Sequence, residues 1–138
     1  MIHNFSNFVV IFPGLELMIK LQSTVIPQLS ALFPVESKPT QIAMATVLLN
    51  YTIVFTSVKS NVEAQVTCLN LCLLFLQGMT DSEARFRNLV SLGTLLSAEQ
   101  RNRKEAKNLE AKEKIEAAKL LDTTDKVLKC ADAVLNAL

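Results

Sequence analysis

The sequence contains few residues that break helices or favour strands. Among its 138 residues it has three glycines, no tryptophan and one tyrosine, and all four prolines precede residue 40. Beyond that point only Gly78 and Gly93 belong to the two strongest helix-breaking types. Alternating runs of β-branched residues, which are typical of strands, are also scarce. The composition therefore predicts an all-α protein, and the length is that of a single domain.

Residues that carry out catalysis or bind metals are also scarce. The chain has one histidine, His3, and three cysteines, and it has no glycine-rich phosphate loop. Cys68 and Cys72 would share one face of a helix, but a zinc site needs two more ligands. Free cysteine is commonly buried, so we interpret both as core residues. We expect no enzyme activity, no metal and no cofactor.

The net charge and the lengths of the apolar runs argue against two classes of partner, nucleic acids and membranes. The net charge is +1, so we expect no nucleic-acid partner. The longest apolar run, 42–55, has 14 residues, whereas a membrane span needs about 20, so no membrane segment is predicted.

The N-terminal residues "MIHNFSNFVVIFPG" lack the basic start and the cleavage site of a signal peptide. Three cysteines without a secretory signal indicate a reducing, cytoplasmic location.

Periodicity and capping residues predict six or seven helical segments. Pro27 is expected to divide the second segment into two pieces. Ser60 with Glu63, and Thr80 with Glu83, have the spacing of capping boxes, and Gly78 is predicted to be a left-handed C-cap. The predicted segments are 2–12, 15–33, 39–55, 60–77, 80–96, 98–121 as one helix or a bent pair, and 124–138.

The segment 98–121 is much more charged than the rest of the chain. Residues 99–119 carry twelve charged side chains, whereas residues 1–80 carry six. Acidic residues are interleaved with the basic ones, and Glu110 and Lys114 have the spacing of a helical ion pair. We interpret this segment as a solvated helix face and not as a nucleic-acid patch.

Two predicted helices align with each other when one is shifted by 41 residues. The stretch 45–56 then lies over 86–97 without a gap. A period of this length is typical of armadillo or HEAT repeats, so we predict an armadillo-like helical solenoid of about three repeats. Gly93 falls in the apolar stripe, where the absence of a side chain allows another helix to approach closely. The polar positions coincide as well: Thr46 falls on Arg87, and Asn50 falls on Ser91.

These four polar residues are the candidate binding residues. In a solenoid, equivalent helices of successive repeats lie side by side and line a concave surface. Thr46, Asn50, Arg87 and Ser91 would then face a shared groove. Two simpler interpretations stay open: Arg87 is a solvated charge, and Asn50 is a buried amide with a backbone partner.

Four stretches of the sequence resemble a known family. "IAMATVLLNYTIVF", "NVEAQVTCLNL", "ARFRNLVSLGTLLS" and "KVLKCADAVLNAL" together resemble the PUL domain, most strongly over residues 40–97. The "LNY" and "FRxLVxLGTL" elements occur in the family's order. By this resemblance, residues 1–138 correspond to the C-terminal part of a PUL domain.

The resemblance implies a fold and a function. PUL domains are armadillo-like solenoids whose basic groove binds the acidic C-terminal tail of the AAA ATPase valosin-containing protein. They are non-catalytic adaptors in ubiquitin-dependent turnover, act in cytoplasm and nucleus, and contact other ubiquitin pathway components indirectly. Arg87, in the "FR" element, would be a groove cation, and Asn50, in "LNY", a groove-lining amide. The alternative is a helical scaffold or oligomerisation fragment without a working peptide groove, in which Phe8 or Phe12 of the apolar N-terminal face makes the contact.

Overall fold

A computed structural model describes residues 15–57 and 62–138, and it is helical with no strand in these ranges. The prediction of an all-α protein is confirmed. The predicted segment 2–12 and Ser60 lie outside the described residues. The helices in the described part are α1 (Leu15–Leu32), α2 (Lys38–Ser57), α3 (Val62–Gly78), α4 (Ser82–Ala98), α5 (Gln100–Asn108), α6 (Ala111–Leu121) and α7 (Asp125–Ala137).

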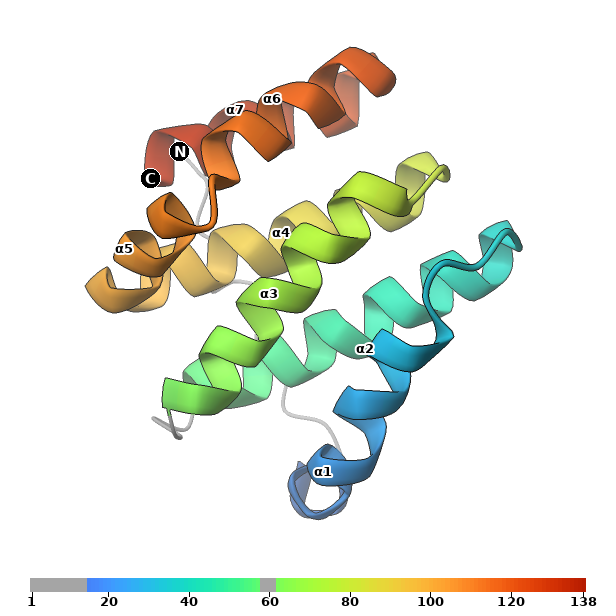
Figure 1. The fold of residues 1–138 in the computed structure, drawn as a ribbon, viewed down its shortest axis with the longest axis vertical. Helices are drawn as coiled ribbons and strands as arrows, with labels where there is room; N and C mark the ends of the chain where they lie inside the picture. Colours follow the sequence, from blue (N-terminus) through green and yellow to red (C-terminus); the bar gives the residue numbers. More distant parts are fainter. Residues whose placement is uncertain (1–14, 58–61) are drawn as a thin grey trace.

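The helices form two layers (Figure 1). Helices α1, α3, α5 and α6 form the front layer. Helices α2, α4 and α7 form the rear layer, and these three run parallel to one another. Helix α4 is central, because it packs against both α2 and α7. The stack consists of repeated units, each with a front part followed by one rear helix. The units are α1–α2, α3–α4 and α5–α6–α7, and in the last one the front part is the α5–α6 pair. This arrangement is that of a helical repeat solenoid, as predicted.

The core follows from the position of α4. Every residue from Asn88 to Leu96 is buried, including Gly93. The close helix approach proposed for Gly93 stays a prediction. The largest apolar side chains that are almost fully buried come from four of the seven described helices and the α3–α4 turn: Leu48, Val54, Leu69, Phe75, Leu76, Met79, Leu89, Leu92, Leu95, Leu96 and Ile115. The cysteines Cys68 and Cys72 are also buried in this core, as expected.

A buried amide joins α2 to the turn between α3 and α4. The Gln41 side chain donates to the Val35 carbonyl (2.9 Å) and to the Thr80 hydroxyl (3.0 Å). Its oxygen accepts from the backbone N–H groups of Thr80 (2.9 Å) and Asp81 (3.0 Å). The predicted N-cap at Thr80 is therefore wrong, because the Thr80 hydroxyl is hydrogen-bonded to the Gln41 side chain. Asp81 caps α4 instead and accepts from the Ala84 N–H (3.0 Å).

Gly78 is the last residue of α3, and its predicted left-handed conformation is wrong. Its role is to leave space for an aromatic ring. A Cβ at this position would lie 2.3 Å from Cζ of Phe33, and that ring packs against Phe75 with centroids 4.9 Å apart. The glycine therefore allows the ring of Phe33 to pack directly over the end of α3.

Two other predictions concern helix continuity. Helix α1 continues through Pro27, so the predicted division is wrong; Ile26 and Leu29, on either side of it, are both buried and hold these turns in place. The segment 98–121 is a bent pair, one of the two predicted alternatives, and Glu110 at the bend has a left-handed φ of 59°. The predicted Glu110–Lys114 pair is not formed. Lys114 donates instead to the carbonyl of Leu109 (2.8 Å) at the end of α5.

Candidate peptide-binding site

A polar cluster, which we call the Arg87 cluster, connects the three parallel helices α2, α4 and α7. It consists of Thr46, Glu83, Arg87, Phe86 and Lys126. Arg87 Nη1 donates to Thr46 Oγ1 (2.5 Å), and Arg87 Nε donates to Glu83 Oε2 (2.8 Å). The second oxygen of Glu83 accepts from Lys126 Nζ (2.8 Å). Lys126 Nζ also lies 4.1 Å from the centroid of the Phe86 ring.

Local sequence explains how these side chains meet. Glu83 and Arg87 are four residues apart in α4, so they lie on one face of the helix. Glu83 is in the first turn of α4, where a negative charge is favourable. Hydrogen bonds from Lys126 and then from Arg87 lower the pKa of Glu83 and outweigh the opposing effect of burial. Its carboxylate is therefore ionised at neutral pH.

The Arg87 cluster is partly open to solvent. The side chains of Arg87 and Lys126 are 36% and 51% exposed, and that of Glu83 is 35% exposed. Two cations at this exposure can bind a carboxylate from another molecule.

A second ion pair, Arg85 with Asp122, is buried and holds α7 in place. Arg85 Nη1 donates to Asp122 Oδ2 (3.0 Å), and the two side chains are 9% and 3% exposed. Asp122 also accepts from the Ser82 hydroxyl (2.8 Å) and from the Thr124 N–H (3.0 Å). These bonds attach the turn between α6 and α7 to the first turn of α4. They thereby position Lys126, near the start of α7, beside Glu83.

The pKa of Asp122 reflects this environment. Burial raises it, but hydrogen bonds from Thr124, Ser82 and Arg85 outweigh burial and hold it well below its ordinary value of 3.8. Asp122 is therefore charged at neutral pH, as the buried guanidinium of Arg85 requires.

The four predicted binding residues have different positions. Thr46 and Arg87 are in direct contact. Asn50 lies one turn after Thr46 in α2 and is half-buried. Ser91 is fully buried, and its hydroxyl donates to the Arg87 carbonyl one turn earlier in α4 (3.2 Å), so this side chain does not face solvent.

Sequence reasoning did not identify Phe86 or Lys126 as site residues, and it assigned Glu83 only a capping role. A third copy of the repeat was the available signal. A further shift of 41 residues places Leu89 on Cys130 and Gly93 on Val134, and all four are buried. This alignment identifies α7 as the third parallel helix, with Lys126 at its start.

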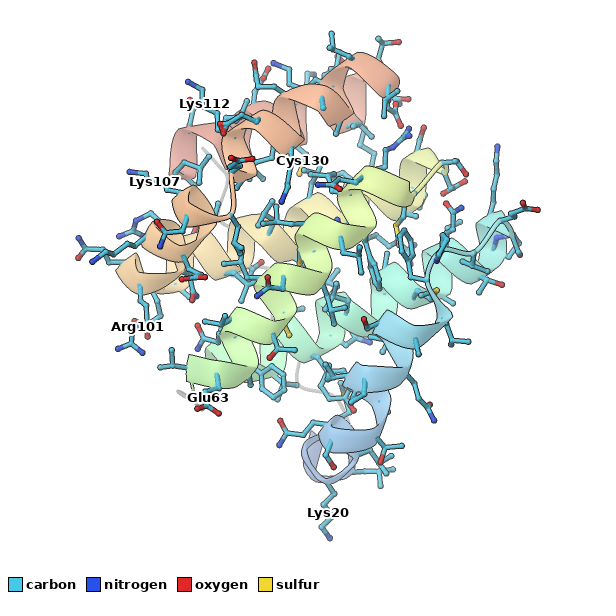
Figure 2. All side chains as sticks on the ribbon, in the orientation of Figure 1. Lys20, Glu63, Arg101, Lys107, Lys112 and Cys130 are labelled. Atoms are coloured by element: carbon cyan, nitrogen blue, oxygen red, sulfur yellow. The ribbon has the colours of Figure 1, made fainter. Side chains whose placement is uncertain are left out.

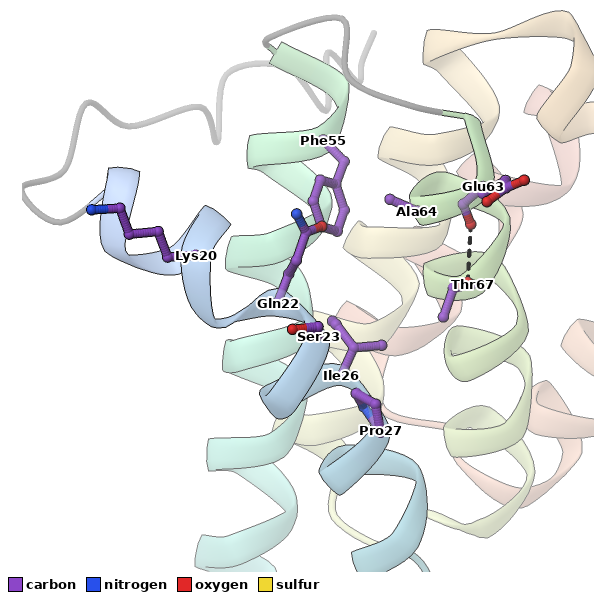
Figure 3. A pocket seen from close by; sticks show the side chains of 9 residues that line it. All are labelled: Lys20, Gln22, Ser23, Ile26, Pro27, Phe55, Glu63, Ala64 and Thr67. Atoms are coloured by element: carbon purple, nitrogen blue, oxygen red, sulfur yellow. Dashed lines mark hydrogen bonds between the residues drawn. The ribbon is translucent and has the colours of Figure 1, made fainter.

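Other surfaces lie elsewhere on the molecule. A pocket of about 430 Å³ lies between α1, the end of α2 and the start of α3 (Figure 3), and it shares no residue with the Arg87 cluster. Arg101, Lys107 and Lys112 of α5 and α6 extend into solvent (Figure 2). Within the described ranges, no group of three or more histidine, cysteine or acidic residues is placed to hold a metal. No helix in those ranges is both long and apolar enough to cross a bilayer.

Comparison with known proteins gives the family. The family model of the PUL domain matches residues 1–133 of this chain. The chain belongs to the PUL domain family. Among curated proteins, phospholipase A-2-activating protein of Xenopus laevis is 32% identical over 137 residues, which is 99% of this chain and 17% of that relative. The chain is thus a protein-interaction domain similar to one part of a much longer protein.

Proposed function

We propose that this PUL domain is a non-catalytic adaptor that binds the acidic C-terminal tail of valosin-containing protein. The Arg87 cluster supports this proposal, because it places two partly exposed cations where three parallel helices meet. The single observation that carries the proposal is the hydrogen bond from Arg87 to Thr46 on the neighbouring repeat. It fixes the orientation of the guanidinium before any ligand arrives.

The chemistry of the cluster fits an acidic peptide. A guanidinium donates two parallel hydrogen bonds to one carboxylate, and its planar group loses little freedom when it does so. Asn50, one turn along α2 from Thr46, adds a half-buried amide that is able to bond to a peptide backbone. Thr46 and Arg87 are therefore the centre of the proposed groove, and Asn50 extends it along α2.

The wider biological setting is inferred from the family. We infer that the domain acts in ubiquitin-dependent protein turnover, in cytoplasm and nucleus, and meets ubiquitin pathway components through its partner. We further infer that these 138 residues are the C-terminal part of a larger PUL-type domain. Both statements are proposals, and their support is the match to the PUL domain family and to part of a longer relative.

A titration with a labelled peptide of the ATPase tail tests the function. Arg87→Glu is expected to weaken binding more than tenfold, because it replaces the central cation with a repelling charge. The melting temperature is expected to change little, since partly exposed ion pairs contribute about 0.2–1 kcal/mol. Lys112→Glu is the control, because Lys112 is exposed on α6 in the other layer. Equal weakening by both variants would contradict the proposal.

One observation favours a second candidate, a helical scaffold. Leu17 and Leu21, four residues apart in α1, are 58% and 42% exposed. An exposed apolar pair on the first described helix suits contact with another helix. Phe8 and Phe12, the residues first considered for such contact, lie outside the described residues. Sedimentation distinguishes this candidate: it requires a concentration-dependent dimer that Leu21→Glu abolishes.

A further inference from the structure

The position of Glu83 assigns it a role that goes beyond helix stabilisation. We propose that Glu83 is an internal competitor, which occupies in the free domain the place that a ligand carboxylate takes between Arg87 and Lys126. This inference rests on the proposed binding of an acidic peptide. It adds Glu83 and Lys126 to the residues that determine which peptides bind.

The geometry is that of a bridging carboxylate. One oxygen of Glu83 lies 2.8 Å from Arg87 Nε, and the other lies 2.8 Å from Lys126 Nζ. Both distances are those of charge-assisted hydrogen bonds. A glutamate or aspartate of a peptide, or its terminal carboxylate, has the same two oxygens and satisfies the same two cations.

The cations stay in place without Glu83. Arg87 Nη1 is held by Thr46, and the ammonium group of Lys126 lies over the Phe86 ring. Arg87 Nη2 has no hydrogen-bond partner among the described residues. When Glu83 moves aside, Nε and Nη2 form a free edge of the guanidinium, which a carboxylate binds with both oxygens.

Exchange is feasible because the cluster is partly exposed. Ion pairs in solvent are weak, so a ligand replaces Glu83 at small cost. Replacement by a single carboxylate only exchanges one bridge for another. A segment with adjacent carboxylates gains more, because it binds Arg87 with one group and Lys126 with another. The competitor therefore selects peptides with closely spaced acidic groups over singly charged ones.

The test compares the complete chain with its Glu83→Gln variant. Glutamine keeps the shape and removes the competing charge. The probe is a fluorescein-labelled peptide with three consecutive aspartates before a free C-terminus, measured by fluorescence anisotropy. We expect the Glu83→Gln variant to bind the peptide about fivefold more tightly, because the peptide no longer has to displace the two weak ion pairs of Glu83. The control is Glu113→Gln, because Glu113 is exposed in α6 and outside the Arg87 cluster, and its affinity should equal that of the wild type.

Two further variants separate this inference from the proposed function. Lys126→Met is expected to weaken peptide binding. It should also reduce the gain in affinity from Glu83→Gln, since one of the two cations for which Glu83 and the peptide compete is lost. Unchanged or weaker binding by a folded Glu83→Gln variant, while Arg87→Met abolishes binding, would overturn the competitor and leave the groove intact. Absence of binding by the wild type and by Glu83→Gln would overturn both. Circular dichroism establishes that each variant is folded.

Discussion

Thr46 and Arg87 are 41 residues apart in sequence and share a hydrogen bond of 2.5 Å. The same shift of 41 residues aligns the two helices that contain them. Residues at equivalent positions of adjacent repeats therefore touch each other, as parallel helices in a solenoid require. This contact joins the repeat pattern of the sequence to the proposed binding surface.

The first prediction concerns the buried pair of Arg85 and Asp122. Asp122→Asn should lower the free energy of unfolding at pH 7 by about 3 kcal/mol, because it leaves a buried guanidinium uncompensated. The folded-state pKa of Asp122 lies below the ordinary value of 3.8, so its contribution is complete above that pH. The contribution should decline as the pH falls below about 4. Urea unfolding at pH 7, 4 and 2.5 measures the difference between variant and wild type.

The matched control is an exposed pair on α7. Asp125 and Lys129 lie 3.1 Å apart with side chains 82% and 78% exposed. Asp125→Asn should cost about 0.5 kcal/mol or less. Equal destabilisation by both variants, or a difference for Asp122→Asn that is no smaller at pH 2.5 than at pH 7, would contradict this explanation of α7 positioning.

A second prediction concerns Asn102, a fully buried amide in α5. Its nitrogen donates to Gln65 Oε1 (2.8 Å) and to the Leu95 carbonyl (2.9 Å). Asn102→Leu should reduce the free energy of unfolding by about 1–3 kcal/mol, because both acceptors would be buried without a donor. Asn108→Leu, at an exposed position in the same helix, is the control. A stable Asn102→Leu variant in chemical denaturation would show that the amide network is dispensable.

A third prediction concerns the contact between Gly78 and Phe33. Alanine normally favours a helix over glycine by about 1 kcal/mol. Here Gly78→Ala should destabilise the protein, since the new Cβ would lie 2.3 Å from Phe33 Cζ. In a Phe33→Leu background the same change should become neutral or stabilising. Thermal unfolding of the four proteins in this cycle measures the coupling, and additive effects would refute the steric explanation.

The sequence predicted those features that depend on local pattern. The scarcity of glycine and the absence of proline after residue 39 predicted helices, and the shift of 41 residues predicted the parallel contact of α2 with α4. Capping was predicted less well. Thr80 has the spacing of a cap, but Gln41, which is 39 residues away, occupies its hydroxyl. Such competition between a local and a distant partner is decided by tertiary packing.

The candidate site was predicted only in part for the same reason. Arg87 and Thr46 are equivalent repeat positions, so their contact follows from the alignment. Lys126 enters the site because the buried pair of Arg85 and Asp122 sets the place of α7. The alignment used for α2 and α4 did not extend to this third helix. Side chains that meet through a third element are therefore the ones that sequence reasoning missed.

The most direct measurement locates the peptide on the domain. Amide and side-chain NMR shifts are recorded for the complete chain during titration with the ATPase tail peptide. We predict that the largest shifts occur at Thr46, Asn50, Arg87 and Lys126, on the parallel layer of α2, α4 and α7. Shifts centred on the basic side chains of α5 and α6, or on the pocket between α1 and α3, would contradict it.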